Sequence, residues 1–362
     1  MAATDHPPHP GRNDPPGVMP AETDRHERTL IAWPTEVRRA FFGGHLEAAR
    51  TAWADVARAV AGYEPVTMVV NPGERASAEA QLGEAAAAPA PGVTLVELAI
   101  DDAWTRDSGP IVVRRPGGEG ADDRIAIQFG FNAWGELVEP FDSDAVVATA
   151  VAGQMGLPVL RAPFVLEGGS IAVDGAGTLV TTERCLLNPN RGPLPDGSPR
   201  TKAGMESLLS HWLGVERVVW LTDGLTDDTD TDGHVDNVVA IPRPGVALLQ
   251  GCDDPGDPDA ATAAESERRL RAAGFEVVIL EALPRTECHG RMLEVPYLNF
   301  YVANGLVVVP VTGHAYDDEA LGIIGEHYPG REVVAVDGAM IAYGGGGPHC
   351  ITQQVPAVGR VR

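Results

Sequence analysis

The chain has 362 residues, 44% of them hydrophobic, a length and composition typical of a globular protein with one large domain or two ordinary ones. Acidic residues outnumber basic ones by 51 to 27, and the net charge of −24 disfavours nucleic acid as a partner, because phosphate binding needs basic patches. No apolar run approaches the roughly 20 residues that span a membrane, and the four cysteines form neither a disulfide framework nor a CxxC zinc pattern.

The first 18 residues are rich in Pro, Gly and Asp and contain no apolar segment, which predicts a disordered tail rather than a signal peptide. We therefore expect a cytoplasmic protein. The acidic charge is typical of a solvated surface, and it also attracts small cationic molecules.

From residue 19 onward, short β-rich segments alternate with helical ones, as in an α/β fold. The segment 45–63 carries apolar residues at helical spacing. No later stretch is long enough to act as a linker, so we expect a single domain over 19–362. Strands are expected at 29–34, 66–70, 93–100, 125–130, 178–183, 215–221, 245–250, 275–280 and 305–311, and helices at 45–63, 74–88, 203–213 and 259–273.

Polar residues with chemical potential recur at a similar interval along this domain. The steps from Asp107 to Glu167, His234, Asn299 and Cys350 are 60, 67, 65 and 51 residues. Such a period predicts repeated β/α units that each deliver one polar side chain to a shared centre. A doubly wound sheet is disfavoured, because the chain lacks a glycine-rich phosphate turn near its start.

Cys350 is the strongest candidate in this set. It follows four consecutive glycines, 344–347, and stands directly after His349. A glycine-rich turn lets a ligand approach the backbone closely, and a nucleophilic thiol needs partners that hold it as a thiolate or move its protons. A single cysteine is more often a small buried hydrophobe, but the glycines and the polar segment ITQQ favour a functional interpretation.

His234 and Asp236 form an HxD pair within the acidic segment DDTDTDGHVDN. Side chains two apart in a strand share one face, so we expect both to reach one ligand, with His234 as general acid and base. The alternative is a solvated turn before the strand VVAIP. Asp228, Asp230 and Asp232 also match the opening of a calcium loop, but the loop's twelfth position is valine and its flanks resemble strands, so we expect no metal.

Two further carboxylates complete the candidate site. Asp107 lies in DDAWTRDSGP, where an aspartate is usually a turn residue, and Glu167 ends an apolar strand before Gly-Gly. A carboxylate at such a strand end needs a partner or a ligand. Converging carboxylates suit a guanidinium group, whose planar fork presents five N–H donors, and Trp104 is placed to cover its cationic face.

Taken together, the chain resembles the agmatine deiminases of the guanidine-modifying superfamily, which are close relatives of the bacterial peptidyl-arginine deiminases. The resemblance runs from about residue 19 to 356. The matching segments are MPAETDRHERTLIAWP, DDAWTRDSGP, QFGFNAWGE, LEGGSIAVDGAGTLVTTERCLLNPNR, DGHVDNVVAIPRPGVALLQ, YLNFYVANGLVVVPV and GGGGPHCITQQVP.

This resemblance implies a five-bladed α/β propeller of pseudo-repeated units, working as a homodimer without metal or organic cofactor. It also implies that Cys350 is the nucleophile and His234 the general acid and base. The carboxylates that hold the guanidinium would be Asp107, Asp236 and Glu167. Residues expected to line the substrate pocket are Trp104, Asp230, Gly168 and Gly346.

The expected reaction is deimination of agmatine through a covalent thiouronium on the cysteine. Departures from the family pattern bear on the substrate: Asp230 and Asp232 stand where the family has Glu and Asn, and Gly-Pro precedes His349. Another guanidine, such as a peptidyl arginine or a different guanidinoalkylamine, is therefore an alternative substrate. Free arginine is disfavoured unless Arg106 or Arg191 clamps its carboxylate. A different class is a non-catalytic calcium- or polyamine-binding protein on the same fold.

Overall fold

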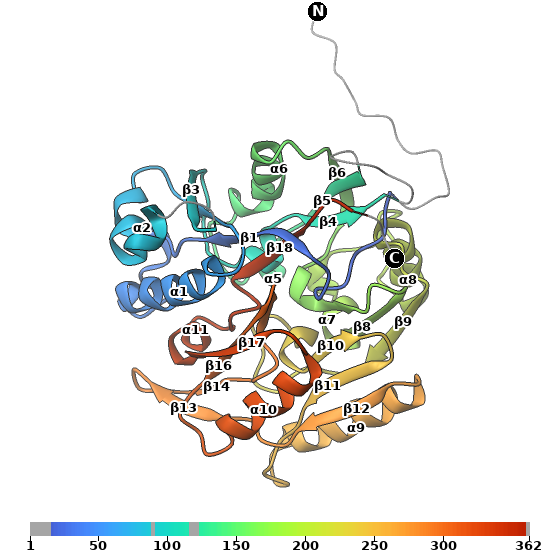
Figure 1. Cartoon of the computed structure of the whole chain (residues 1–362). Helices are drawn as coiled ribbons and strands as arrows, with labels where there is room; N and C mark the ends of the chain where they lie inside the picture. Colours follow the sequence, from blue (N-terminus) through green and yellow to red (C-terminus); the bar gives the residue numbers. More distant parts are fainter. Residues whose placement is uncertain (1–15, 88–90, 116–122, 360–362) are drawn as a thin grey trace, which may run out of the picture.

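The computed structural model describes residues 16–87, 91–115 and 123–359. Five sheets share one pairing pattern, which Figure 1 shows as strands grouped toward the middle with most long helices outside them. In each sheet the first strand pairs antiparallel with the second, and the second pairs parallel with the third. A helix connects the two parallel strands, as parallel pairing requires.

The first sheet has the order β18-β1-β2-β3 and joins the two ends of the chain, because β18 follows all other strands in sequence. The next sheets follow in chain order as β4-β5-β6, β7-β8-β9, β10-β11-β12 and β15-β16-β17, with a separate hairpin β13-β14. The strands are β1 (His26–Ala32), β2 (Val66–Val70), β3 (Val93–Glu97), β4 (Ile111–Arg114), β5 (Arg124–Gly130), β6 (Val159–Val165), β7 (Ile171–Val173), β8 (Thr178–Thr182), β9 (Arg217–Leu221), β10 (Val239–Arg243), β11 (Val246–Gln250), β12 (Glu276–Leu280), β13 (Arg285–Cys288), β14 (Arg291–Glu294), β15 (Tyr301–Ala303), β16 (Leu306–Val311), β17 (Glu332–Asp337) and β18 (Thr352–Pro356).

The helices pack an apolar stripe on the sheets. In α1 this stripe includes Leu46, Trp53 and Val60, all fully buried, and each such side chain contributes roughly 1.5–3 kcal/mol relative to exposure. The helices are α1 (Leu46–Ala61), α2 (Arg75–Leu82), α3 (Glu84–Ala87), α4 (Thr105–Ser108), α5 (Ala133–Glu136), α6 (Asp144–Gln154), α7 (Glu183–Leu186), α8 (Lys202–Leu213), α9 (Pro258–Ala272), α10 (Asp317–His327) and α11 (Ala339–Tyr343). No helix in the described residues is both long and apolar enough to cross a membrane.

Two predicted elements differ from the structure. The helix expected over 74–88 is divided at Gly83, whose φ of 56° is not helical, so α2 ends there and α3 begins after it. Most of the predicted tail, residues 1–15, lies outside the described residues. Its last residue, Val18, is described and exchanges two backbone hydrogen bonds with Arg114.

Candidate active site

The five recurring polar residues occupy equivalent places in the five sheets. Each lies in the segment just before the first strand of a sheet, so each sheet presents one polar side chain at the same end. In chain order these segments precede β4, β7, β10, β15 and β18 and carry Asp107, Glu167, His234 with Asp236, Asn299 and Cys350. The predicted interval therefore reflects a repeated strand–strand–helix–strand unit.

Cys350 lies in the turn between α11 and β18, and only 6% of the residue is exposed. Its Sγ lies 3.2 Å from Asn299 Oδ1 and 3.5 Å from Asp236 Oδ2. A Cβ on Gly346 would approach that sulfur to 2.9 Å, so the glycine keeps the space over the thiol open. Burial, together with the charges of Asp236 and Asp107, raises the pKa of the Cys350 thiol well above its ordinary value.

A chain of buried ionisable groups leads from the thiol to the N-terminal segment. The ring of His349 bridges two carboxylates, with Nδ1 at 2.8 Å from Asp236 Oδ2 and Nε2 at 2.8 Å from Glu22 Oε1. Burial lowers the pKa of His349, but the two carboxylates outweigh burial and raise it. Burial raises the pKa of Glu22, but the charges of His349 and Arg106 outweigh burial and lower this pKa to about 2. An imidazolium at residue 349 therefore holds Asp236 in place.

The sequence predicted that His234 lies in a strand, but in the structure this residue caps the 3-10 turn Val235–Asn237. Its backbone N–H donates to Asp228 Oδ2 at 3.0 Å and to Thr231 Oγ1 at 3.1 Å, and these bonds close the acidic loop into a turn that buries the ring. Neither ring nitrogen has a hydrogen-bond partner among the described residues, and Nδ1 lies 4.0 Å from Asp107 Oδ2. Burial lowers the pKa of His234, but Asp107, Cys185 and Asp236 raise it well above its usual value.

Asp107 projects from α4 and is held by two donors. Its Oδ1 accepts from the backbone N–H of Gly169 at 2.9 Å, and its Oδ2 accepts from Trp134 Nε1 at 2.9 Å. Trp134 reaches this position from α5, where its own φ of 57° is not helical and is a backbone conformation that few non-glycine residues adopt. Burial raises the pKa of Asp107, and the carboxylates of Asp236 and Glu167 add to the rise.

Glu167 is fully buried and pairs with Arg191, whose Nε donates to Oε1 at 2.8 Å. Arg191 also donates to the backbone oxygen of Thr231 at 2.8 Å and forms an ion pair with Asp232. Its guanidinium is fully engaged, so it is not free to clamp a substrate carboxylate. Arg106 also pairs internally, with Nη1 at 3.1 Å from Glu22 and Nε donating to a backbone oxygen, while its buried Nη2 has no partner among the described residues.

A metal does not fit this centre. Among the described residues, the side chains whose metal-ligating atoms converge within 4.8 Å are Glu167, Cys185 and His234. Arg191 pairs with that same glutamate and opposes a second cation. In the acidic loop, Asp228 accepts hydrogen bonds from Thr231, His234 and Asn237 and is directed toward the protein instead of an ion.

A narrow cavity opens above Cys350. It is lined by Phe41, Trp104, Asp107, Trp134, Leu137, Val138, Asp230, Thr231, Gly344, Gly345 and Cys350. The indole of Trp104 packs edge-on against Trp53 with ring centroids 5.4 Å apart, which fixes it as a wall. Aromatic walls with carboxylates at the base suit a flat organic cation.

The structure brings nearly all the predicted site residues together, and Gly168 lies apart from them. Gly168 lies against Arg106, because a Cβ there would come within 2.2 Å of that residue's backbone oxygen, so it does not line the cavity. The glycine at the centre is Gly169, where a Cβ would meet His234 Nδ1 at 2.6 Å and Asp236 Oδ2 at 2.9 Å. Sequence reasoning did not place Glu22, Trp134, Gly169 and Cys185 at the centre. It considered Arg191 only as a possible carboxylate clamp and His349 only as the neighbour of Cys350, whereas they pair with Glu167 and Asp236.

Comparison with known proteins gives consistent results. A model of the Porphyromonas-type peptidyl-arginine deiminase family matches residues 18–356. The agmatine deiminases of Pseudomonas fluorescens (strain SBW25) and Pseudomonas aeruginosa (strain LESB58) are 37% and 38% identical, each aligned over 94% of this chain and 95% of its own length. The structure of the agmatine deiminase of Enterococcus faecalis superposes with a TM-score of 0.84 at 31% identity, covering 94% of this chain and 96% of that chain.

Proposed function

Because the chain belongs to the Porphyromonas-type peptidyl-arginine deiminase family, we propose that it is a hydrolase converting agmatine to N-carbamoylputrescine and ammonia. The observation that carries this proposal is a pair of buried carboxylate oxygens, Asp236 Oδ1 and Glu167 Oε2, that lack a donor among the described residues. Buried acceptors are normally paired, and a guanidinium supplies the missing donors as a planar fork.

In this proposal the guanidinium lies between Asp107 and Asp236, with Glu167 as a third acceptor and Trp104 over its face. The cation offsets the negative charge that, with burial, holds the Cys350 thiol neutral, so substrate binding favours loss of the thiol proton to bulk water, which returns a proton to the thiolate after the product leaves. The resulting thiolate attacks the central guanidinium carbon and forms a carbon–sulfur bond.

His234 then acts twice. Its imidazolium gives a proton to the departing nitrogen, the carbon–nitrogen bond breaks, and ammonia leaves an S-alkylthiouronium on Cys350. The neutral imidazole takes a proton from water, whose oxygen attacks the same carbon. The carbon–sulfur bond breaks, the thiolate is restored, and the ureido product leaves. One further proton goes to ammonia, so guanidinium and water give the urea and ammonium.

We also infer that residues 19–362 form one catalytic domain with the five units arranged as a five-bladed propeller. The shared pairing pattern and the equivalent position of the polar residues before each first strand support this arrangement. Pairing of β18 with β1 supports closure of the ring, since it joins the last unit to the first.

Ammonia release from agmatine, free arginine and a peptidyl arginine tests the function directly. We expect agmatine to be turned over and free arginine to be a poor substrate, since Arg106 and Arg191 are both engaged in internal ion pairs. Turnover of peptidyl arginine alone would assign the same chemistry to another substrate, and no ammonia from any of them would refute the proposal.

The thiol of Cys350 is expected to be unreactive at neutral pH in the absence of substrate. Its pKa is raised, so the thiolate fraction at pH 7 is smaller than that of an ordinary cysteine and grows only at alkaline pH. Alkylation by iodoacetamide, followed by mass spectrometry of the Cys350 peptide from pH 6 to pH 10, measures this. Glutathione is the reference, and a rate that already plateaus below pH 8 would contradict the expected direction.

Gly169→Ala is expected to reduce turnover about a hundredfold, because a methyl group there displaces the His234 ring and two carboxylates that must stay aligned. Gly322→Ala in α10 is the matched control, since open space surrounds a Cβ at that position. Steady-state ammonia release from both variants, with circular dichroism to verify folding, decides the point. Full activity in folded Gly169→Ala would mean that the centre tolerates displacement.

A further inference from the structure

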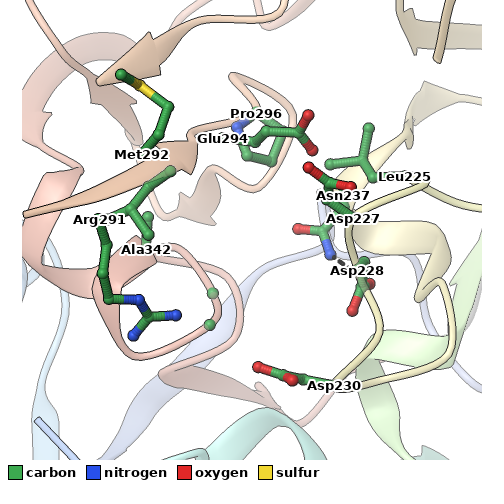
Figure 2. A pocket seen from close by; sticks show the side chains of 13 residues that line it. Leu225, Asp227, Asp228, Asp230, Asn237, Arg291, Met292, Glu294, Pro296 and Ala342 are labelled. Carbon is green, nitrogen blue, oxygen red and sulfur yellow. Dashed lines mark hydrogen bonds between the residues drawn. The ribbon is translucent and has the colours of Figure 1, made fainter. Parts of the chain in front are cut away.

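A second pocket, of about 310 Å³, adjoins the cavity over Cys350 and extends away from it (Figure 2). The two share Asp230 and Gly345 in their linings, so they border one another at these residues. The far part is lined by residues of the hairpin β13-β14 and of the loop before His234. These residues include Leu225, Asp227, Met292, Leu293, Glu294 and Pro296.

At the far end two carboxylates face each other. Figure 2 shows the carboxylates of Glu294 and Asp227 directed toward one another, at the opposite end of the pocket from Asp230. The Glu294 side chain is only 9% exposed, and its Oε2 has no hydrogen-bond partner among the described residues. Burial, then the charges of Asp259 and Asp227, raise the pKa of Glu294 to about 7. This end of the pocket therefore holds a buried carboxylate oxygen that lacks a donor among the described residues.

The nearby arginines do not fill that need. Arg285 contacts Glu294 through the other carboxylate oxygen, and the same guanidinium is shared with Asp257 at 2.7 Å and with Asp259 at 3.5 Å. Arg291 lies at the opposite side of the pocket, where Nη1 donates to the backbone oxygen of Tyr343 at 3.0 Å. One guanidinium thus serves three carboxylates, and Oε2 of Glu294 is left without a donor among the residues that the structure describes.

We propose that Glu294 and Asp227 form a distal ammonium subsite, so that the enzyme also accepts guanidines whose alkyl chain carries two ammonium groups. This inference rests on the proposed function for its guanidine end. The substrate lies along the pocket with the guanidinium at Cys350, a first ammonium near Asp230 and a second between Glu294 and Asp227. The pocket lining also includes the apolar residues Leu293 and Ala342, which suit the methylene groups.

An organic ammonium fits better than a metal ion. Calcium takes six to eight oxygen ligands, whereas this end of the pocket offers two facing carboxylates. An ammonium group has three N–H donors on a compact charge, which match the free oxygen of Glu294 and the carboxylate of Asp227.

Calorimetric titration with spermidine and putrescine tests the subsite without requiring turnover, because neither amine contains a guanidine. Spermidine, the longer triamine, is expected to bind wild type and to weaken about fivefold in Asp227→Asn and in Glu294→Gln, as an accessible ion pair predicts. Asp142→Asn is the matched control for Asp227→Asn, because both residues are exposed aspartates and Asp142 lies outside the pocket. Putrescine binding and agmatine turnover are expected to change less than twofold in all three variants, Asp227→Asn, Glu294→Gln and Asp142→Asn.

The outcomes separate the two proposals. Equal spermidine affinity in wild type and both pocket variants would overturn the distal subsite, even if agmatine is turned over. Calcium that binds wild type and competes with spermidine at Asp227 would overturn the organic assignment. Absence of agmatine turnover would refute the deiminase function, while the spermidine titration still reports on the pocket. Asp227→Asn keeps the test valid if Glu294→Gln disturbs the contact with Arg285 and misfolds.

Discussion

Cys350→Ala is expected to abolish ammonia release from agmatine, by about ten-thousandfold or more, while agmatine binding stays close to that of wild type. The methyl group of alanine cannot form the carbon–sulfur bond on which both halves of the reaction depend. The carboxylates of Asp107, Asp236 and Glu167 remain, so the guanidinium keeps its acceptors. Ammonia release and calorimetric binding of agmatine are measured on the same preparation.

Cys252→Ala is the matched control, since it removes a half-buried thiol from a surface loop outside the cavity. It is expected to keep full turnover. Retention of more than a tenth of the activity by Cys350→Ala would mean that another group is the nucleophile. Loss of binding together with turnover would instead mean that the thiol supports the shape of the site, since Sγ lies against Asn299 and Asp236.

The spacing of polar residues allowed much of the architecture to be predicted. The strands at 66–70 and 305–311 and the helix at 45–63 were predicted closely, because each is a continuous apolar run or a clear helical stripe. The interval of 51 to 67 residues arises because each sheet repeats one strand–strand–helix–strand unit. Pairing of β18 with β1 was not predictable, because it joins segments more than 300 residues apart.

The side-chain contacts that the sequence could not reveal are long-range and electrostatic. Glu22 reaches the centre from the N-terminal segment, 327 residues before His349, and no local pattern links them. The choice between Gly168 and Gly169 depends on which Cα faces Asp236, which adjacent identical residues do not disclose. His349 was visible beside the nucleophile, but its role in holding Asp236 depends on a bridge formed only in the fold.

The hydrogen bonds accepted by Asp228 explain why His234 and Asp236 do not lie on a strand. His234 and Asp236 were expected on one strand face, but His234 caps a 3-10 turn and Asp236 lies within it. Asp228 closes this turn by accepting hydrogen bonds from three residues. The acidic segment that resembled a calcium loop thus has a structural part in this fold. Its carboxylates satisfy backbone donors and the Arg191 guanidinium, and they position the histidine ring.

His234→Gln is expected to lower agmatine turnover about a thousandfold, in the middle of the range for loss of a general acid and base. Glutamine keeps a similar size and can hydrogen-bond to Asp107, but it cannot give and take a proton in the two steps. The natural ring has a raised pKa, so it is protonated at neutral pH and ready to donate to the leaving nitrogen. The pH profile of turnover should therefore lose its alkaline limb in the variant.

His211→Gln on the outer helix α8 is the matched control and is expected to be fully active. Mass spectrometry of the variant after mixing with agmatine adds a second observation. If His234 also activates water, any thiouronium that forms on Cys350 persists in His234→Gln, because the second step is slowed as well. A variant that turns over slowly without such an adduct would confine His234 to the first proton transfer. A fully active His234→Gln would show that His234 does not carry out the proton transfers. The two buried ring nitrogens of His234, which have no hydrogen-bond partner among the described residues, would then have a role other than proton transfer.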